Sequence, residues 1–398
     1  MRIEAIGRRR PLTLLAVSAA AVGAVAGSAS ASSHRTLFVS PHGHDTAACT
    51  HKHPCKTIGR AVAKAHRGDS IKVAPGTYRE QVVVDKKLDI GGQSKPIVNA
   101  LGQTNGFRIT SAGAGSVIHN FRVKNANEEG ILALHTSRVV IQNNTVTNND
   151  RAVNQTTPSG QCEPQGETPG DCGEGIHLNG TRHSRVTGNL VQGNSGGILL
   201  TDETGPASFN TISRNRVKGN LQDCGITLAS HNPAAVKLTG PPLPDTGTPQ
   251  PSVAGVHDNL IQSNNVVGNG VTTPGAGIQM AGGPPGAAVY SNTIKNNTVT
   301  ANGHPGITLH SHAPGQDFNG NKVLDNIVNR NATHGDDTAG VTQTTGILLF
   351  SGADHLRNTV VRGNTIRDNH FGIWTKNVPP IAKSANTFHN VAVPVHQQ

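Results

Sequence analysis

A short pattern of apolar residues and asparagines recurs along most of this chain, from about residue 130 to residue 377. It reads (Val/Ile)-x-x-Asn-x-(Val/Ile)-x-x-Asn, and its apolar positions have the spacing of short β-strands rather than of helices. Such a repeat is typical of a solenoid, in which stacked turns bury a face that one turn cannot bury alone. The first asparagine of the pattern falls at Asn144, Asn189, Asn215, Asn264, Asn297, Asn326 and Asn364.

A second piece, Gly-Ile followed by alternating apolar residues, accompanies each asparagine pattern. We expect each turn to supply at least two strands that pair in parallel with the neighbouring turns, about 4.8 Å away. Because side chains alternate along a strand, Ile176 and Leu178 should face the core, and His177, Thr308 and His310 should face outward. The glycines that open this piece are Gly130, Gly175, Gly197, Gly225, Gly277, Gly306, Gly346 and Gly372.

The repeated asparagines have an expected structural role. At one corner of successive turns their amides can stack into a ladder, which satisfies groups that would otherwise be buried without partners. Aromatic residues make up only 3% of the chain, and helical periodicity is rare. We therefore predict an all-β protein that is a single parallel β-helix.

Residues 32–103 differ from the repeats, and we expect them to form an N-terminal helical cap and the first turns. Ile58, Ala61, Val62 and Ala65 have helical spacing. An apolar helix face would cover the first turn, whose open strand edge would otherwise invite aggregation. The repeats should then occupy 104–398. Three loop insertions are expected at 151–174, 232–254 and 332–345, where long loops on one side of a solenoid can wall a binding groove.

Residues 1–31 have the features of a secretory signal peptide. Arg2, Arg8, Arg9 and Arg10 precede an apolar stretch, and cleavage is expected near Ala31. The sequence leaves open whether export uses the general secretory or the twin-arginine route. No later stretch has the length of a membrane span. We therefore expect a secreted, cell-surface or periplasmic protein.

Charge narrows the choice of partner. The chain has 34 basic and 24 acidic residues, and residues 1–31 account for four arginines and one glutamate, which leaves 30 against 23, or +7. A basic secreted solenoid suits an acidic polysaccharide or a cell-wall glycan, although the same charge serves solubility. Nucleic acid is not expected, because the basic residues are dispersed and do not alternate with aromatic residues. The protein is expected to be a monomer.

Five cysteines in an oxidising compartment favour local disulfide bonds. The close spacings predict Cys49–Cys55 and Cys162–Cys172, and Cys224 is then left over as a buried small side chain. The loop between Cys49 and Cys55 also holds two histidines, which is an alternative metal pattern, but so short a secreted loop favours the disulfide.

Four segments near the N-terminus resemble the opening of secreted right-handed parallel β-helix proteins of the pectin-lyase-like superfamily. The asparagine and Gly-Ile repeats are similar to the same superfamily, so the resemblance covers nearly the whole chain after residue 31. The resemblance implies that the β-helix is right-handed but implies no particular reaction, since that superfamily includes lyases, hydrolases, epimerases and adhesins. The segments are Thr36-Leu-Phe-Val-Ser-Pro-His-Gly-His-Asp45, Pro54-Cys-Lys-Thr-Ile58, Gly68-Asp-Ser-Ile71 and Ala74-Pro-Gly-Thr-Tyr-Arg-Glu80.

The catalytic motifs of particular members do not carry over. Of the polygalacturonase motifs only Asp336-Asp337 has a counterpart, and the Asp-Pro-His-Asp order of mannuronan epimerases does not occur here. Pectate lyases gather acidic residues for calcium, and the repeat register indicates no such cluster on adjacent turns.

Polar residues that follow the Gly-Ile strands predict a candidate site. Six residues after the opening glycine come Glu203, His231, Gly283 and His312 on successive turns. Strand spacing places Glu203 roughly 5 Å from His231, and His312 about 10 Å from His231. Gly283 leaves a gap that could hold a sugar ring. With 20 histidines in the chain, accidental neighbours are the alternative explanation.

Asp202, His310, His177 and Asp317 complete the candidate set. Asp202 lies beside Glu203, and His310 lies two residues before His312. His177 and Asp317 are candidate substrate-binding residues, Asp317 by way of its loop. Glu174 and Asp223 stand at the opposite ends of their strands, roughly 20 Å from the cluster by strand rise, and are expected to be cap or loop carboxylates.

The candidate residues favour β-elimination or epimerisation of an acidic polysaccharide. Hydrolysis needs two carboxyl groups about 5 to 9.5 Å apart, and this register offers only the sequence neighbours Asp202 and Glu203. Proton abstraction beside a uronate carboxyl instead requires an imidazole base. We assign His231 as the base, Asp202 or Glu203 as its orienting carboxylate, and His310 or His312 to the substrate.

Other functions stay open. A glycoside hydrolase, a non-catalytic cell-wall or glycan binder, and a metal-binding accessory protein that uses His231, His310 and His312 are the alternatives. No cofactor is expected, and the sequence supports no specific metal site.

Overall fold

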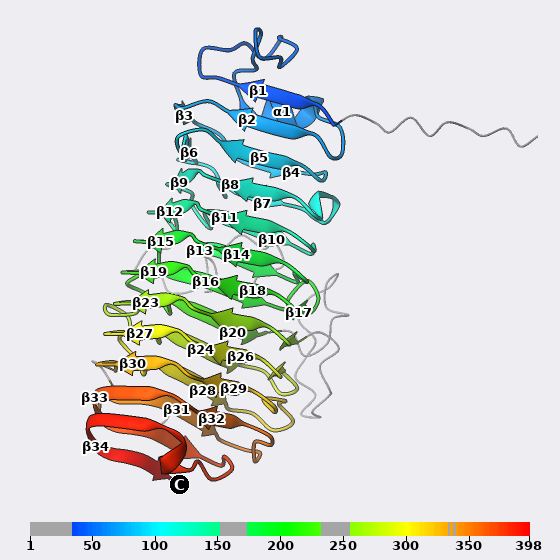
Figure 1. The fold of residues 1–398 in the computed structure, drawn as a ribbon. Coiled ribbons are helices and arrows are strands. Elements are labelled where there is room, and N and C mark those ends of the chain that lie inside the picture. Colours follow the sequence, from blue (N-terminus) through cyan, green and yellow to red (C-terminus); the bar gives the residue numbers. More distant parts are fainter. Residues whose placement is uncertain (1–33, 152–172, 232–254, 333–334, 337–339) are drawn as a thin grey trace, which may run out of the picture. The chain divides into compact units, whose positions relative to one another are not determined.

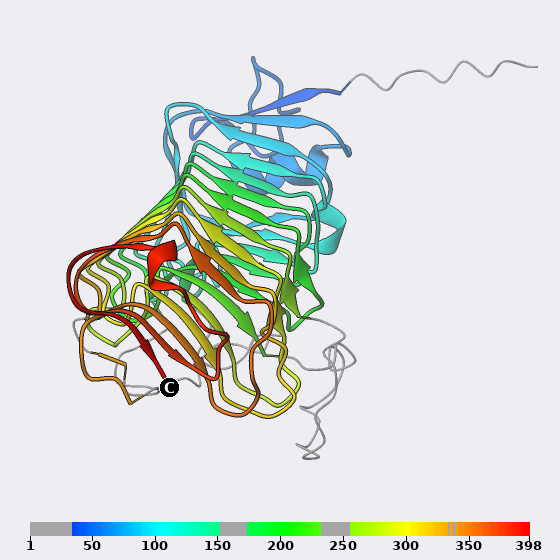
Figure 2. The same cartoon turned by 60° about the horizontal axis from the view of Figure 1, so that its bottom comes forward.

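The computed structural model describes residues 34–151, 173–231, 255–332, 335–336 and 340–398. Their strands stack as successive turns of a parallel β-helix, coloured from blue to red in Figures 1 and 2. Named strands pair in parallel, each with the strands of the turns before and after it. The prediction of an all-β parallel β-helix is confirmed, whereas the predicted signal peptide lies outside the described residues.

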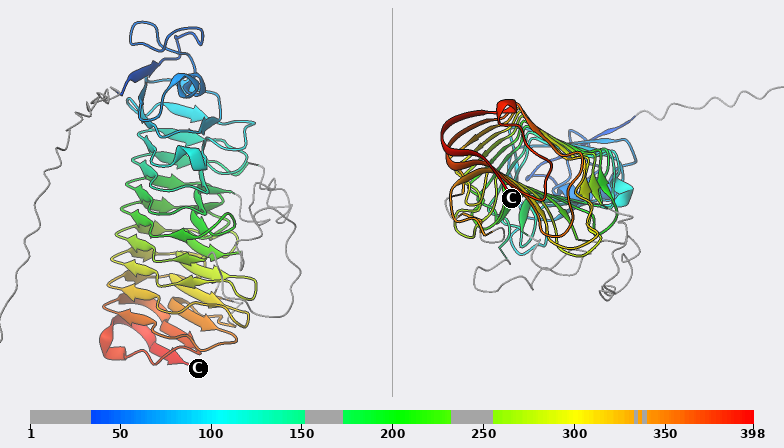
Figure 3. Two further views of the ribbon diagram at one scale, coloured as in Figure 1. Left: turned by 90° about the vertical axis from the view of Figure 1, so that its right-hand side faces the viewer. Right: turned by 90° about the horizontal axis from the view of Figure 1, so that it is seen from below.

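Seen along the stack in Figure 3, the strands superpose as separate faces around one core. The first face is an 11-stranded sheet. Its strands are β1 (Thr36–Val39), β2 (Ser70–Val73), β5 (Asp89–Gly92), β8 (Val117–His119), β11 (Val140–Gln142), β14 (Arg185–Thr187), β18 (Thr211–Ser213), β22 (Leu260–Gln262), β26 (Thr293–Lys295), β29 (Lys322–Leu324) and β32 (Val360–Arg362).

Two further ladders of strands join through the long strand β33 (Thr365–Lys376). One ladder holds β3 (Thr77–Tyr78), β6 (Ile97–Asn99), β9 (Arg122–Lys124), β12 (Thr145–Thr147), β15 (Leu190–Gln192), β19 (Arg216–Lys218), β23 (Asn265–Val267), β27 (Thr298–Thr300), β30 (Ile327–Asn329) and β34 (Thr387–Gln397). The other, called the site ladder below, holds β4 (Val82–Val84), β7 (Phe107–Ile109), β10 (Ile131–Leu134), β13 (Glu174–Asn179), β16 (Gly196–Thr201), β20 (Ile226–Ser230), β24 (Ile278–Gly282), β28 (Ile307–Ser311) and β31 (Thr345–Ser351). A small third sheet pairs β17 (Ala207–Ser208), β21 (Val256–His257) and β25 (Val289–Tyr290).

The core is a column of branched aliphatic side chains, one set from each turn. Ile176 and Leu178 of β13 belong to it, as the alternation predicts, and both are fully buried. The register places Ile176 beside Ile131 and Ile198, so like residues stack on like. Since each turn contacts only its neighbours, this column is what makes the turns mutually dependent.

Asparagine ladders run along the corners of the described turns, as the repeat predicts. At Asn264, for example, the side-chain Nδ2 donates to Asn297 Oδ1 at 3.0 Å and to Ile212 O at 2.9 Å. Its Oδ1 accepts from both the backbone N and the Nδ2 of Asn215. The amide is thereby fully used, which explains why asparagine recurs at a buried corner. A second ladder follows the second asparagine of the repeat, and a third, through Asn210, Asn259, Asn292 and Asn321, was not predicted.

The single described α-helix, α1 (Ile58–Lys64), packs its buried residues Ile58, Ala61 and Val62 into the first turns, as predicted for the cap. Thr57 caps its N-terminus, and Glu80 accepts hydrogen bonds from the backbone N–H groups of Ile58 and Gly59, both at 2.8 Å. A carboxylate at a helix N-terminus is favourable because the first N–H groups lack partners within the helix. Single 3₁₀ turns occur at η1 (Ser111–Gly113) and η3 (Lys383–Ala385).

The predicted disulfide between Cys49 and Cys55 is present beside this cap, whereas Cys162 and Cys172 lie outside the described residues. Cys224 is a buried free thiol, as expected. Within the described part of the chain, no helix has the length and apolar character needed to cross a membrane.

Candidate functional site

A carboxylate–imidazole pair lies where β16 and β20 end. Glu203 Oε1 contacts His231 Nδ1 at 2.9 Å, and the two side chains are 8% and 16% exposed. Burial raises the pKa of Glu203, but the hydrogen bond and charge of His231 outweigh burial, so that its pKa lies below the usual value. The structure thus brings together the two residues that the register placed on adjacent turns, and it keeps Glu203 ionised beside the ring.

Asp202 has a different arrangement from the one predicted. Its carboxylate is fully buried and accepts three hydrogen bonds, from Ser230 Oγ at 2.8 Å, from the backbone N of His231 at 2.9 Å and from the backbone N of Gly255 at 2.8 Å. It therefore holds residues on both sides of the 232–254 insertion. Of the two carboxylates predicted to orient the His231 ring, Glu203 is the one that contacts it, whereas Asp202 accepts from the Ser230 hydroxyl and from two backbone N–H groups.

His177 faces outward from the core column, as predicted, but it is fully buried under other residues. Its Nε2 lies 2.8 Å from Thr201 Oγ1, and Thr201 Oγ1 donates in turn to Glu203 Oε2. On its other side, His177 Nδ1 lies 3.3 Å from Glu129 Oε1. A continuous chain of polar contacts therefore runs from Glu129 through His177 and Thr201 to Glu203 and His231.

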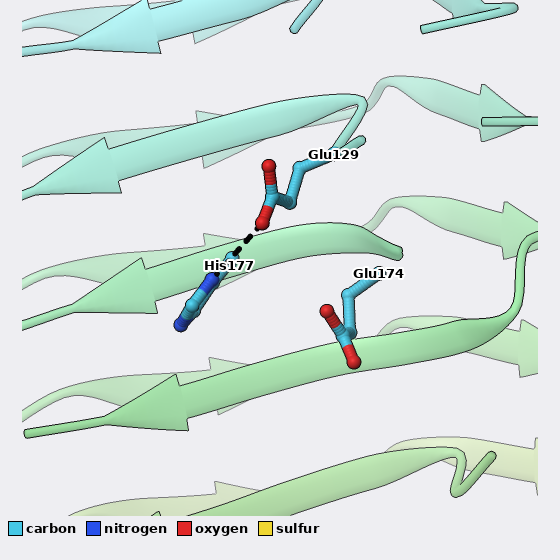
Figure 4. A group of neighbouring side chains, drawn as sticks. All are labelled: Glu129, Glu174 and His177. Carbon is cyan, nitrogen blue, oxygen red and sulfur yellow. Dashed lines mark hydrogen bonds and ion pairs between the residues drawn. The ribbon is translucent and has the colours of Figure 1, made fainter. Parts of the chain in front are cut away.

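Glu129 and Glu174 gather around His177, as Figure 4 shows. One ligand-type atom from each of these three residues lies within 4.8 Å of the other two, and all three side chains are buried. Glu174 therefore adjoins His177, one of the candidate residues, and with Glu129 it forms a carboxylate pair on adjacent turns that the repeat register did not indicate.

The carboxylate Asp150 lies close to this group. Burial raises its pKa well above the usual value, and the negative charges of Glu129 and Asp223 raise it further against the hydrogen bond from Ser195 N. This part of the outer face therefore gathers carboxyl groups in a region from which water is largely excluded, and burial favours the neutral form of Asp150.

A second carboxylate–imidazole pair lies further along the site ladder. His310 Nε2 contacts Asp336 Oδ2 at 3.1 Å, and both side chains are buried. The ring of His312 lies 5.3 Å from that of His310 and 5.4 Å from that of Phe350, measured between centroids. Burial, together with the nearby His310, lowers the pKa of His312. Asp336 was noticed in the sequence but not paired with His310, because the two are 26 residues apart.

The imidazoles of both pairs, His231 and His310, line one cavity of about 310 Å³, which is within the size range of small-molecule sites. Its floor is formed by small residues of β24 and the residue after it, including Gly282 and Gly283, in agreement with the gap expected there. Asp223 also lines the cavity, so its expected separation from the cluster is wrong. Cys224, His231, Gln279, His310 and His312 are among the other residues that line it.

Asp317 does not line this cavity. Its Oδ1 instead accepts from the backbone N and the Nδ2 of Asn319 within its own turn. Of the described residues, the only group of three His, Cys, Asp or Glu ligand atoms that lie within 4.8 Å of one another is Glu129, Glu174 and His177. His231, His310 and His312 therefore do not form the metal site considered from the sequence.

A larger hollow of about 1220 Å³ lies at β34, where Asp368, Lys383 and Phe388 are among the residues that line it. Its lining includes one carboxylate and one lysine but no carboxylate–imidazole pair. We assign the candidate site to the smaller cavity, because two imidazoles that each contact a carboxylate, His231 and His310, both line it.

Comparison with known proteins agrees with this fold. The sequence matches the family described as "Right handed beta helix region" over residues 105–241 and 250–355, and the family described as "Protein of unknown function (DUF1565)" over residues 41–85, which include the cap. A search of curated proteins gives no significant match.

Three solved structures share the fold at low sequence identity. The pectate lyase Pel9A is 15% identical with a TM-score of 0.56, over 83% of this chain and 79% of the lyase. The Dettilon tailspike protein is 16% identical with a TM-score of 0.52, over 89% of this chain and 68% of the tailspike. The A-module of the Azotobacter vinelandii mannuronan C-5 epimerase AlgE4 is 13% identical with a TM-score of 0.52, over 83% of this chain and 91% of the module. With the family match covering more than half of its length, the chain belongs to the right-handed β-helix family, and its fold is the pectin-lyase-like parallel β-helix that the sequence predicted.

Proposed function

We propose that this protein is an extracellular carbohydrate-active enzyme that abstracts the proton next to the carboxyl group of a uronate unit, by β-elimination or epimerisation. The observation that carries the proposal is the contact between Glu203 and His231, an imidazole that lines a cavity together with His310, which contacts Asp336. Imidazole is the side chain whose unperturbed pKa suits proton transfer near neutral pH.

His231 is the proposed base. Its Nδ1 faces Glu203 Oε1, so the proton on the neutral ring is held at Nδ1 and the lone pair is at Nε2. When Nε2 takes the substrate proton, the ring becomes an imidazolium whose charge the ionised Glu203 stabilises. The lowered pKa of Glu203 supports this role. A protonated carboxyl group could neither hold the proton of the neutral ring at Nδ1 nor stabilise the charge of the imidazolium.

The abstracted proton leaves its electron pair delocalised into the uronate carboxylate. In elimination this pair forms a carbon–carbon double bond while the bond to the glycosidic oxygen breaks, and that oxygen takes a proton. In epimerisation the carbon takes a proton on its opposite face. We assign proton delivery to His310, which Asp336 holds two turns from His231, about 10 Å away by strand spacing.

His312 is assigned to binding the substrate. Because burial and His310 lower its pKa, it is a neutral imidazole that can donate one hydrogen bond to the uronate carboxylate. His177 contributes indirectly, since it contacts Thr201 and Thr201 donates to Glu203. Asp317 is not assigned to the substrate, because it does not line the cavity.

Several observations support an extracellular polysaccharide as the partner. The fold is shared with a pectate lyase and a mannuronan epimerase, which is a likeness of fold alone at this identity. The basic excess after residue 31 favours an acidic chain, and the Cys49–Cys55 disulfide favours an oxidising compartment. Residues 1–31 as a signal peptide, residues 32–103 as cap and first turns, and a monomeric state belong to the same proposal.

The test is a screen of the purified protein on polymannuronate, polyguluronate, polygalacturonate and glycosaminoglycans. The expected result is an unsaturated uronate product or a change in epimer content on at least one polyuronate. His231→Asn and Glu203→Gln should lower the rate by about 10²- to 10⁴-fold. The matched control is His257→Asn, since His257 stacks on Tyr290 in the small third sheet and does not line the cavity.

Three results would refute the proposal. Full activity of His231→Asn would show that another group is the base. Release of reducing ends from a neutral glycan, with no reaction on any polyuronate, would favour a glycoside hydrolase. Binding of a polyuronate without any product would favour the non-catalytic glycan binder.

A further inference from the structure

We propose that Glu129, Glu174 and His177 form a buried binding site for one divalent first-row transition-metal ion of the zinc class. This inference goes beyond the proposed function and does not depend on it. The three residues come from adjacent turns of the site ladder, His177 and Glu174 from β13 and Glu129 from the residues just before β10 (Figure 4).

The distances suit a metal ion. With bonds of about 2.0–2.2 Å in a tetrahedral arrangement, two ligand atoms lie roughly 3.4 Å apart. His177 Nδ1 and Glu129 Oε1 already lie 3.3 Å apart, and the Glu174 oxygen falls within the 4.8 Å limit of the group. With the Glu174 oxygen at the same spacing, the three residues would supply a three-ligand set.

The tautomer of His177 directs a lone pair at the carboxylates. Thr201 has one hydroxyl proton, which it donates to Glu203, so Thr201 Oγ1 accepts a hydrogen bond from His177 Nε2–H. In the neutral ring, Nδ1 then carries a lone pair and faces Glu129 Oε1, which is also an acceptor. Two acceptors at 3.3 Å repel unless a cation or a proton lies between them.

Neighbouring residues hold the ligands as outer-shell partners do in metal sites. Asn105 Nδ2 donates to Glu129 Oε2 at 2.7 Å, which leaves Oε1 for the ion. Gly196 lies against Glu174, and a β-carbon at Gly196 would come within 3.1 Å of Glu174 Oε1. Such second contacts orient ligands and raise affinity.

The donor set favours a zinc-class ion over calcium. Calcium takes six to eight oxygen ligands, whereas one imidazole nitrogen and two carboxylates on rigid strands match zinc or cobalt with three protein ligands. Since the ligands are buried, the ion would stabilise the stack and hold His177 in the contact chain that ends at His231.

The experiment uses the full-length protein, stripped by a chelating resin, loaded separately with Co²⁺, Zn²⁺ or Ca²⁺, and passed through a desalting column. We expect one Co²⁺ or Zn²⁺ retained per chain and no Ca²⁺. Bound Co²⁺ should show visible d–d bands without the near-ultraviolet charge-transfer band of a thiolate, which excludes Cys224 as a ligand. Zinc should also raise the temperature of unfolding.

Variants locate the ion. His177→Gln and Glu174→Gln should abolish retention of one ion per chain, and Asn105→Ala should weaken affinity by about 10- to 100-fold. His312→Gln is the matched control, because it removes an imidazole from the cavity and should leave retention unchanged.

Retention by His177→Gln equal to that of the wild type would overturn the proposal. If the His177→Gln variant does not fold, retention of metal by the wild-type protein is the deciding measurement. A stripped wild type that retains no Co²⁺ or Zn²⁺ would show that a protonated His177 balances the carboxylates instead. Loss of polyuronate activity in a protein that still binds metal would reject only the proposed function.

Discussion

Replacement of Asp202 by asparagine tests whether this carboxylate holds the base of an insertion rather than acting on the substrate. Asp202 accepts hydrogen bonds from Ser230, His231 and Gly255, and it is fully buried. Asp202→Asn keeps the shape of the side chain and removes the charge. One of the two carboxylate oxygens is replaced by an NH₂ group, a hydrogen-bond donor that then faces one of the donors of Ser230, His231 or Gly255.

The magnitude follows from the pKa of Asp202, which burial raises from 3.8 to about 6 against the hydrogen bonds of Ser230 and His231. A carboxyl group with a higher pKa in the folded state binds its proton more tightly there. Its contribution to stability is therefore complete below about pH 4 and is lost as the pH rises through about 6. A difference of about two pH units corresponds to roughly 3 kcal/mol.

Asparagine does not ionise, so the variant does not lose stability as the pH rises through about 6. It does lose one buried hydrogen bond, at a cost of about 1–3 kcal/mol. Asp202→Asn should therefore be about 1–3 kcal/mol less stable than the wild type at pH 4. At pH 7.5 it should be equally stable or up to about 2 kcal/mol more stable. Urea unfolding followed by circular dichroism at both pH values measures the difference.

Asp85→Asn is the control, since Asp85 is more than half exposed beside Lys86 and should change stability by less than about 0.5 kcal/mol. A larger loss of stability for Asp202→Asn at pH 7.5 than at pH 4 would refute the reasoning. It would show that the ionised carboxylate is the favoured form and that its hydrogen bonds outweigh burial.

Two further predictions concern the solenoid itself. Asn264→Ala removes four buried hydrogen bonds and should cost about 4 kcal/mol in urea unfolding. Asn386 is the half-buried last position of the same ladder, and water can replace the three hydrogen bonds of its side chain, so Asn386→Ala should cost only about 1 kcal/mol. Equal costs would contradict a ladder that stabilises by burial. Cys224 should resist thiol reagents in the folded protein, because burial and then the charge of Asp223 raise its pKa, and denaturation without reduction should release one reactive thiol per chain. Three reactive thiols would show that Cys162 and Cys172 are unpaired, and five would contradict the Cys49–Cys55 bond as well.

The fold could be predicted because the spacing of asparagines and aliphatic residues in the repeat corresponds directly to the stacking of its turns. Asparagine at a fixed position in each turn requires a stacked partner, and alternating aliphatic residues require a shared core, so the period alone specifies parallel stacking. The contact between Glu203 and His231 followed from counting residues in register. Local spacing also predicted Cys49–Cys55, since a six-residue separation leaves few other partners.

Glu129 and Glu174 were missed because the alternation of side chains breaks at the opening glycines. A β-carbon on Gly175 would lie 2.4 Å from Val191 Cγ1, so this position faces the core, as does the following Ile176. Two consecutive inward positions place the preceding Glu174 on the outer face. Strict alternation from Ile176 would place Glu174 in the core. The repeat register was counted from Gly175 towards the C-terminus, so it did not include the residue before that glycine.

The roles of Asp202 and Asp336 could not be predicted from local pattern. Asp202 bonds to Gly255, 53 residues later, and Asp336 comes from an insertion with no repeat register. Such contacts depend on where long loops return, which neither periodicity nor propensity fixes.

In the proposed reaction, His231 removes a proton from the carbon next to a uronate carboxyl. The most direct measurement is proton NMR of a polyuronate incubated with the enzyme in deuterated water. We expect deuterium at that carbon or an unsaturated product, with the rate unchanged in His257→Asn and lowered at least about 100-fold in His231→Asn. A polyuronate that is cleaved with that proton retained, or a His231→Asn variant as fast as the wild type, would contradict it.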